Sequence, residues 1–198
     1  MNLEETKIKL QSMLKPERYV HSLGVAQSSF DLAQKYGYDP QRAYYVGLLH
    51  DCAKNISKQE QIEICNQNGI ELDDIELITS GLIHAKTGFI VARDEFGLTD
   101  PELLNAIFYH ATGRENMTLI EKIVYVSDMI EPSRKFDNLE ELRKEAFVDL
   151  DRAVLMTMNL VLKFNIDKNS ILHPATLLAR NYLLRTTTER YKHRKINS

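Results

Sequence analysis

Six residues with side chains that could bind a metal ion lie in otherwise apolar stretches of the sequence. They are His21, His50, Asp51, His84, His110 and Asp128. Buried ionisable groups are costly unless they are paired or bound to a cation. Imidazole and carboxylate ligands together suit zinc, iron, manganese, cobalt and nickel. The pattern predicts a metal centre, and six ligands with Asp51 as a bridge would serve two ions that promote phosphoryl displacement.

The segment LLHDCAK, residues 48–54, supplies the adjacent pair His50 and Asp51. If the segment is helical, Gly47, His50, Asp51 and Lys54 share one face. The remaining positions are apolar, so we expect a mostly buried helix with one polar stripe. For an isolated His-Asp pair, a structural hydrogen bond at a helix end is as good an explanation as a metal site. Histidine or aspartate residues recur in five otherwise apolar helical segments, and this recurrence favours the metal site.

Phosphate chemistry at such a centre requires nearby positive charge. The candidates, each close in sequence to a predicted ligand, are Arg18, Lys54, Arg114 and Arg134. An arginine fork matches two phosphate oxygens at once. The alternative for each basic residue is a solvated surface charge, and this alternative is strongest for Arg114.

Helix signals dominate the rest of the sequence. Helices are expected over residues 16–36, 39–54, 149–164 and 173–186, with capping residues before others at Ser57, Thr99, Thr118 and Asn138. No segment alternates with a period of two. The sequence therefore predicts an all-α fold of roughly nine helices joined by short loops.

The glycines indicate two kinds of position. Gly37, Gly69 and Gly97 follow helical stretches, as is typical of the left-handed residue after a helix. Gly24, Gly47, Gly81, Gly88 and Gly113 each lie one helical turn from a candidate histidine. Glycine inside a helix costs about 1 kcal/mol relative to alanine. We therefore expect a bulky group to approach the backbone beside each histidine, with close helix packing as the alternative.

Composition narrows the functional class. The 198 residues suit one domain, residues 1–198, and the hydrophobic (43%) and charged (27%) fractions are typical of a soluble globular protein. A net charge of -3 argues against a nucleic-acid partner. Cys52 and Cys65 lack zinc-site spacing and are expected to be buried thiols. The acidic N-terminal segment predicts no signal peptide, and no apolar run is long enough to span a membrane, so we expect a cytoplasmic protein.

The ordered set H…HD…H…H…D resembles the HD-domain superfamily of all-α, metal-dependent phosphohydrolases. The segments LLHDCAK, FYHATG, EKIVYVSDMIEPSR and ILHPATLLARN further resemble the YqeK family of bacterial HD proteins, from Arg18 to Asn181. Members of that family carry iron and hydrolyse diadenosine tetraphosphate symmetrically to two ADP. The resemblance implies an HD core at about residues 16–132. It also implies C-terminal helices at about residues 138–186 that complete a nucleotide pocket.

The resemblance also implies roles for individual residues. His21, His50, Asp51 and Asp128 would hold a first metal, and His84 and His110 would complete a second or contact phosphate. The implied catalytic residues are Asp51, Lys54, His84 and His110. The implied nucleotide contacts are Arg18, His21, Lys54, His84, His110, Ala111, Arg134, Ile171, His173, Pro174, Thr176 and Asn181. Ile171 and Pro174 would enclose a purine, with an ordinary helix start as the equal alternative for this segment.

Several alternatives stay open at this point. The chain could be another HD-type nucleotide phosphohydrolase or phosphodiesterase, an HD-type di-iron oxygenase, or a non-catalytic helical scaffold or nucleotide sensor. The expected partner is a small dinucleoside polyphosphate, with no nucleic acid and no membrane. Iron is the implied metal, with manganese, cobalt, nickel or zinc as alternatives. The sequence leaves the number of metal ions and a homodimer open.

Overall fold

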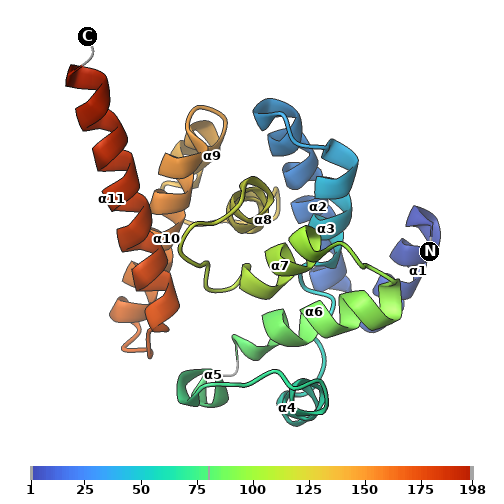
Figure 1. Ribbon diagram of the computed structural model, residues 1–198. Helices are drawn as coiled ribbons and strands as arrows, with labels where there is room; N and C mark the ends of the chain where they lie inside the picture. The colour runs from blue at the N-terminus through green and yellow to red at the C-terminus, as the bar shows by residue number, and fades with distance from the viewer. Residues whose placement is uncertain (1, 80, 197–198) are drawn as a thin grey trace.

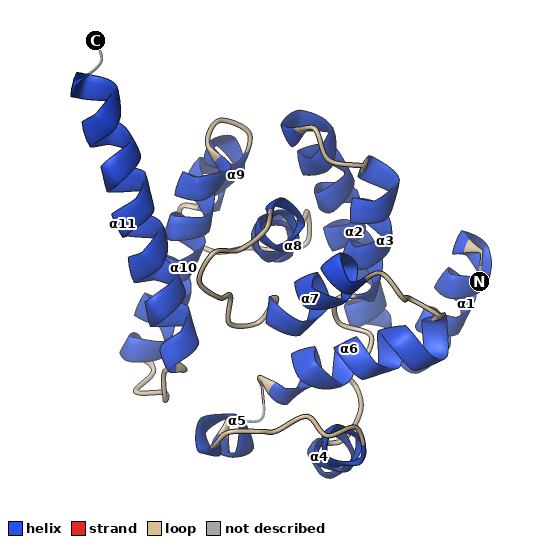
Figure 2. Cartoon of the chain, viewed as in Figure 1, coloured by secondary structure: helices blue, strands red, loops and turns tan. Residues whose placement is uncertain are grey.

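Helices form all the regular secondary structure in residues 2–79 and 81–196, the part of the chain that this computed structural model describes (Figure 2). Side chains beyond residue 187 lie outside the description. The helices are α1 (Leu3–Met13), α2 (Pro16–Tyr36), α3 (Pro40–Leu49), α4 (Lys58–Gln67), α5 (Asp74–Ile78), α6 (Ile83–Phe96), α7 (Pro101–Tyr109), α8 (Leu119–Ile130), α9 (Leu139–Ala146), α10 (Leu150–Asp167) and α11 (Pro174–Ile196). The all-α prediction is confirmed.

Two helices, α1 and α5, were not predicted, so the roughly nine expected helices become eleven in the described residues. Helix α1 starts at a reciprocal capping box between Asn2 and Glu5, and α5 starts at another between Asp73 and Glu76. Helix α5 has only 5 residues. A segment this short is difficult to recognise from hydrophobic periodicity.

Predicted helix starts were correct where a side chain could cap the helix locally. Thr118 and Glu121 form the expected reciprocal capping box at α8. Thr99 was the wrong residue for α7, because Asp100 caps that helix and directly precedes its first-turn proline. Asn138 precedes α9 in a left-handed conformation and makes no side-chain cap.

The predicted helix over residues 39–54 ends earlier than expected, at Leu49. Consecutive turns follow, in which the N–H of Cys52 donates to the carbonyl of Leu49 and the N–H of Lys54 donates to that of Asp51. His50 and Asp51 therefore project from the end of a helix into a turn, and they do not form a stripe along a helix.

Helix α8 lies at the centre of the molecule and packs against α2, α3, α7, α9 and α10 (Figure 1). Its apolar residues Ile120, Ile123 and Val124 are fully buried. Because α2, α3 and α7 pack against this one helix and α6 packs against α7, the segments that carry predicted ligands meet inside the fold. The sequence intervals between these segments are long, but the distances between them in space are short.

The glycine prediction was partly correct. Gly24, Gly47 and Gly88 lie inside helices in close contact with protein atoms. A Cβ at Gly47 would lie only 2.7 Å from Ser29 Oγ, which is the helix-packing alternative. Gly81 and Gly113 are not helical, and Gly113 has a φ of 69° that favours glycine.

Both cysteines are buried free thiols, as expected. Burial raises the pKa of the Cys52 thiol, so this group stays protonated. Among the described helices, none combines the length and apolar character that a membrane span requires.

Candidate metal centre

The carboxylate of Asp51 lies at the centre of the predicted ligand set. Its Oδ1 lies 3.0 Å from Nε2 of His84 and 3.5 Å from Nε2 of His110. Its Oδ2 lies 3.8 Å from Nε2 of His21 and 3.6 Å from Nε2 of His50. The two oxygens of one carboxylate thus face two separate pairs of histidines.

Asp128 joins one of these pairs. Its Oδ1 lies 3.0 Å from Nε2 of His21 and 4.0 Å from Nε2 of His50. Two ligand groups result: His21, His50, Asp51 and Asp128 on one side, and Asp51, His84 and His110 on the other. All six predicted ligands therefore converge, and the two groups share only Asp51.

The cluster contains buried polar atoms without hydrogen-bond partners. His50 is 0% exposed and Asp51 is 2% exposed. Nε2 of His21, Nε2 of His50 and Oδ1 of Asp51 have no hydrogen-bond partner. Buried polar atoms usually have a partner, so such atoms need an explanation. Nitrogen and oxygen lone pairs directed at a common centre fit a divalent cation.

Backbone carbonyls orient two of the histidine rings. Nδ1 of His50 lies 2.7 Å from the carbonyl oxygen of Gly47, and Nδ1 of His110 lies 2.7 Å from that of Ile107. A carbonyl can only accept, so Nδ1 carries the proton in both rings. The lone pair of each Nε2 then faces the cluster, as metal-binding histidines require.

Glu131 orients a third ring and was not among the predicted site residues. It is 1% exposed, and its Oε1 lies 3.0 Å from Nδ1 of His21. Burial by itself would raise the pKa of Glu131, but hydrogen bonds from Ser133 and His21 lower it below the ordinary value. The only hint in the sequence was an acidic residue at the end of the apolar segment KIVYVSDMIEP.

The protonation states suit metal binding. Burial lowers the pKa of both His50 and His84 to about 4, so both rings are neutral near pH 7. Burial by itself would raise the pKa of Asp51, but the surrounding His50, His110 and His84 hold it well below the usual range. The centre thus presents neutral imidazoles at His50 and His84 and an ionised carboxylate at Asp51.

Two predicted arginines contact the aspartates of the cluster. Nη1 of Arg18 donates to Oδ2 of Asp51 at 2.8 Å. Arg134 donates to the carbonyl of Asp128 at 2.8 Å through Nε and to its Oδ1 at 2.5 Å through Nη2. Both arginines are partly exposed, so they can contact a bound anion as well as the aspartates.

A cavity of about 240 Å³, here called the central cleft, opens beside the cluster. Its wall includes the predicted residues Arg18, Asp51, Lys54, His84, His110, Ala111, Asp128 and Arg134. Nζ of Lys54 lies 3.2 Å from Nε2 of His84. Burial lowers the pKa of Lys54.

Two hydroxyls in the wall of the central cleft were missed by sequence reasoning. The side chains of Tyr125 and Thr157 are buried, and neither hydroxyl has a hydrogen-bond partner. Tyr125 precedes Asp128 by one helical turn on α8, which was the available signal. Unpartnered hydroxyls in a cleft are suited to bind a ligand.

The C-terminal residues predicted to contact nucleotide do not line the central cleft. These residues are Ile171, His173, Pro174, Thr176 and Asn181. Nε2 of His173 lies 2.8 Å from Oδ2 of Asp73, and its Nδ1 accepts from the backbone of Ala175 as a helix cap. Thr176 donates to the carbonyl of Thr112 at 2.9 Å, which ties α11 to the loop after His110.

Arg114 forms an ion pair with Glu121 and does not contact the cluster. Its guanidinium makes a forked contact with the buried carboxylate of Glu121, with Nε at 3.0 Å from Oε2 and Nη2 at 2.9 Å from Oε1. It also lies outside the wall of the central cleft. The structure therefore gives Arg114 a role in holding the loop before α8.

The fold and the cluster define an all-α protein with a buried His/Asp centre that fits a divalent cation. The profile of the HD domain family matches residues 18–133. The chain belongs to the HD-domain family and, within it, to the YqeK type that includes the relatives below.

Two relatives are named bis(5'-nucleosyl)-tetraphosphatase, symmetrical. The chain is 37% identical to the Halalkalibacterium halodurans protein, over 86% of this chain and 91% of the relative. It is 35% identical to the Bacillus subtilis protein, over 93% of this chain and 98% of the relative. A solved structure from Clostridium acetobutylicum, described as a predicted HD superfamily hydrolase involved in NAD metabolism, matches with a TM-score of 0.91. It is 44% identical and covers 94% of this chain and 98% of its own.

Proposed function

We propose that this chain is a metal-dependent hydrolase that cleaves diadenosine tetraphosphate symmetrically, giving two ADP. The observation that carries the proposal is the carboxylate of Asp51 between two groups of ligands, beside a cleft with three basic side chains. Relatives that match over nearly their whole length bear the name of this activity. Proteins with the same fold can catalyse different reactions. The identity of the proposed substrate therefore rests on the site and the relatives together, and not on the fold.

In this proposal the two ligand groups bind cations. His21, His50, Asp51 and Asp128 would hold the first ion, and Asp51, His84 and His110 would hold a second. Iron is the proposed metal, from the resemblance to the YqeK family. A cation bound there would lower the pKa of water and screen charge on the phosphoryl group.

The side chains of the central cleft position and neutralise the polyphosphate. Lys54, Arg18 and Arg134 offset the negative charge that develops on the phosphoryl oxygens. Asp51 is also the proposed acceptor of the proton from the attacking water, because its ionised carboxylate lies at the centre of the cluster. Oδ2 of Asp51 stays bonded to Arg18, which keeps the carboxylate oriented.

A covalent intermediate on cysteine is not part of this proposal. Cys52 and Cys65 are buried, and burial raises the pKa of both thiols. Thiols that stay protonated are poor nucleophiles, and neither lines the central cleft. Water is therefore the proposed nucleophile.

The test combines metal analysis with chromatography of the reaction products. The purified protein should contain a transition metal and convert diadenosine tetraphosphate to ADP alone. Asp51→Ala should lose both the metal and the hydrolysis, whereas Asp167→Ala, a matched change at an exposed ion pair, should keep both. Formation of ATP and AMP, or full activity of Asp51→Ala, would contradict the proposal. A panel of other nucleotides and phosphodiesters tests the alternative substrates.

A further inference from the structure

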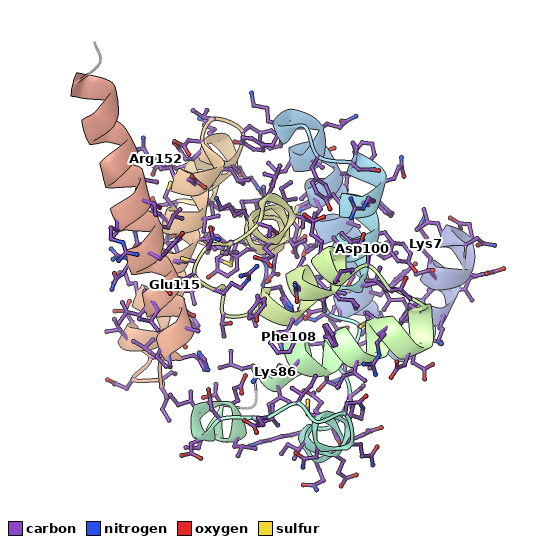
Figure 3. The ribbon with its side chains drawn as sticks, viewed as in Figure 1. Lys7, Lys86, Asp100, Phe108, Glu115 and Arg152 are labelled. Atoms are coloured by element: carbon purple, nitrogen blue, oxygen red, sulfur yellow. The ribbon has the colours of Figure 1, made fainter. Side chains whose placement is uncertain are left out.

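Two more cavities adjoin the central cleft, and each shares two wall residues with it. A cavity of about 190 Å³ shares Leu82 and Ala111 with the central cleft. Its wall includes Lys86 and Phe108, which lie near each other on α6 and α7 in Figure 3, with Nζ 5.7 Å from the ring centroid. We call it the α7 cavity.

The other neighbour is larger and lies between α2 and the segment that joins α8 to α9. This cavity, here called the loop cavity, has a volume of about 440 Å³ and shares Arg18 and Arg134 with the central cleft. His21, one of the six candidate metal ligands that we call the metal cluster, also lines it, as do Lys135 and Phe136. The shared residues place both of these cavities next to the central cleft, at different parts of its wall.

The central cleft is too small for the whole proposed substrate. Pockets for drug-sized ligands measure roughly 300–1,000 Å³, and a dinucleoside tetraphosphate exceeds that ligand size. The central cleft, at about 240 Å³, falls below this range. Symmetrical cleavage also requires the middle phosphoanhydride bond at the metal cluster, with an identical ADP half extending to each side. Two cavities that each adjoin the central cleft, beside the cluster, meet that requirement.

We propose that the loop cavity binds the second ADP half of the substrate, so that the chain holds a dinucleotide on both sides of the metal cluster. This inference rests on the proposed function and names how the same site selects a substrate with two nucleosides. Arg18 and Arg134 line both the central cleft and the loop cavity, so both guanidinium groups can contact a phosphate chain that extends from one to the other.

The side chains of the loop cavity match the parts of a nucleotide. Lys135 is exposed and makes no ion pair within the described residues, so its charge is available to a phosphate group. Phe136 packs partly against the hydrophobic core and also lines the loop cavity, so the part of its ring at the cavity is the proposed stacking surface for a base. Glu131 in the same wall is already bonded to His21 and Ser133, so the remaining negative charge is that of the exposed Glu17.

The test separates binding of the second half from the chemistry. Phe136→Ala and Lys135→Ala should each raise KM for diadenosine tetraphosphate by about tenfold, with little change in kcat. Calorimetric titration of the metal-loaded protein with ADP should find two sites per chain in the wild type and one in the double variant. Phe164→Ala, an exposed phenylalanine on α10, and Lys58→Ala, an exposed lysine on α4, are matched controls that should behave as wild type.

The KM values and the number of ADP sites distinguish the inference from the proposed function. Unchanged KM in both variants, or one ADP site in the wild type, would overturn the inference and leave the proposed hydrolysis intact. Absence of hydrolysis by the wild type would overturn the proposed function and the inference together. Phe136→Tyr, which keeps the aromatic face, should restore KM, and failure to do so would show that Phe136 acts through folding. Lys135→Ala changes an exposed side chain, so it tests the cavity even if Phe136→Ala does not fold.

Discussion

Glu131 lies 3.0 Å from Nδ1 of His21, and both side chains are buried. An ionised carboxylate can only accept, so it holds the proton of His21 on Nδ1. The Nε2 lone pair then faces Asp51 and Asp128 at 3.8 and 3.0 Å. Glu131 is therefore a positioning residue for a ring that faces the metal cluster.

Removing this carboxylate should weaken metal binding without removing a ligand. We expect Glu131→Ala to lower metal affinity by about 10–100-fold, the usual effect of losing a partner of a metal-bound histidine. Competition with a chromogenic chelator measures the affinity. Glu4→Ala, at an exposed ion pair on α1, is the control. Equal affinity of Glu131→Ala and wild type would show that His21 needs no such support.

Gly24 should be intolerant of a side chain because Glu131 occupies the space beside it. A Cβ there would lie 2.7 Å from Oε2 of Glu131. This carboxylate cannot move freely, because the N–H of Ser133 donates to Oε2 and His21 contacts Oε1. We expect Gly24→Ala to cost about 1–3 kcal/mol of unfolding free energy and to lower metal affinity. Gly81→Ala is the control, because nothing lies within 4 Å of its Cβ position. Denaturant unfolding measures the change in stability, and metal titration measures the change in affinity. A Gly24→Ala variant with wild-type stability and metal affinity would show that the space beside Gly24 is not restricted by Glu131.

The shared carboxylate makes the metal stoichiometry of variants informative. Asp51 belongs to both ligand groups, whereas His110 belongs to one. We expect His110→Ala to keep the ion held by the His21 group and to lose the other, and Asp51→Ala to lose both. Elemental analysis after gel filtration measures the ions per chain. Identical metal content in the wild type and His110→Ala would favour a single ion.

Acid should destabilise the chelator-treated protein through its buried histidines. The pKa of His50 and of His84 is lowered to about 4 in the fold, against about 6.5 when unfolded. Between pH 6.5 and 4 the unfolded chain binds more protons, so stability falls as pH falls, by about 1.4 kcal/mol per pH unit for each histidine. Below that window Asp51, whose pKa is also lowered, extends the loss in the same direction.

Urea unfolding between pH 7 and pH 4.5 measures this loss. The variant His50→Gln should show a shallower pH dependence because one of the two titrating rings is gone. A midpoint that does not change with pH in the wild type would mean that these rings are not protected from protonation in the fold.

Thr157 offers a test of substrate contact that does not depend on the metal ligands. Its buried hydroxyl has no partner, so Thr157→Val should leave stability unchanged or raise it by up to about 1 kcal/mol. If the hydroxyl bonds to substrate, KM should rise about fivefold. Thr6→Val is the control with the opposite expectation, because the hydroxyl of Thr6 donates a hydrogen bond to the Asn2 carbonyl, far from the cleft. It should lower stability and leave KM unchanged, and a wild-type KM in Thr157→Val would exclude the contact.

The sequence alone predicted the all-α fold class, which the structure confirms, and the six candidate ligand residues. Apolar helical segments and local caps such as Thr118 with Glu121 depend on neighbours in the chain, so they can be predicted without tertiary contacts. The histidines and aspartates were conspicuous because ionisable groups in apolar segments need a partner. The helix end at Leu49 was missed because the apolar, polar-striped segment continues through Lys54, and only the structure shows that its hydrogen bonds change to turns.

Only the tertiary structure showed how the candidate ligands are arranged around Asp51. The packing of α2, α3 and α7 against α8, and of α6 against α7, places two histidines beside each oxygen of Asp51 and brings Glu131 to His21. It also placed the C-terminal residues outside the central cleft and revealed the loop cavity. Distances between residues far apart in the chain depend on how whole helices pack, and no local pattern of residues records that packing.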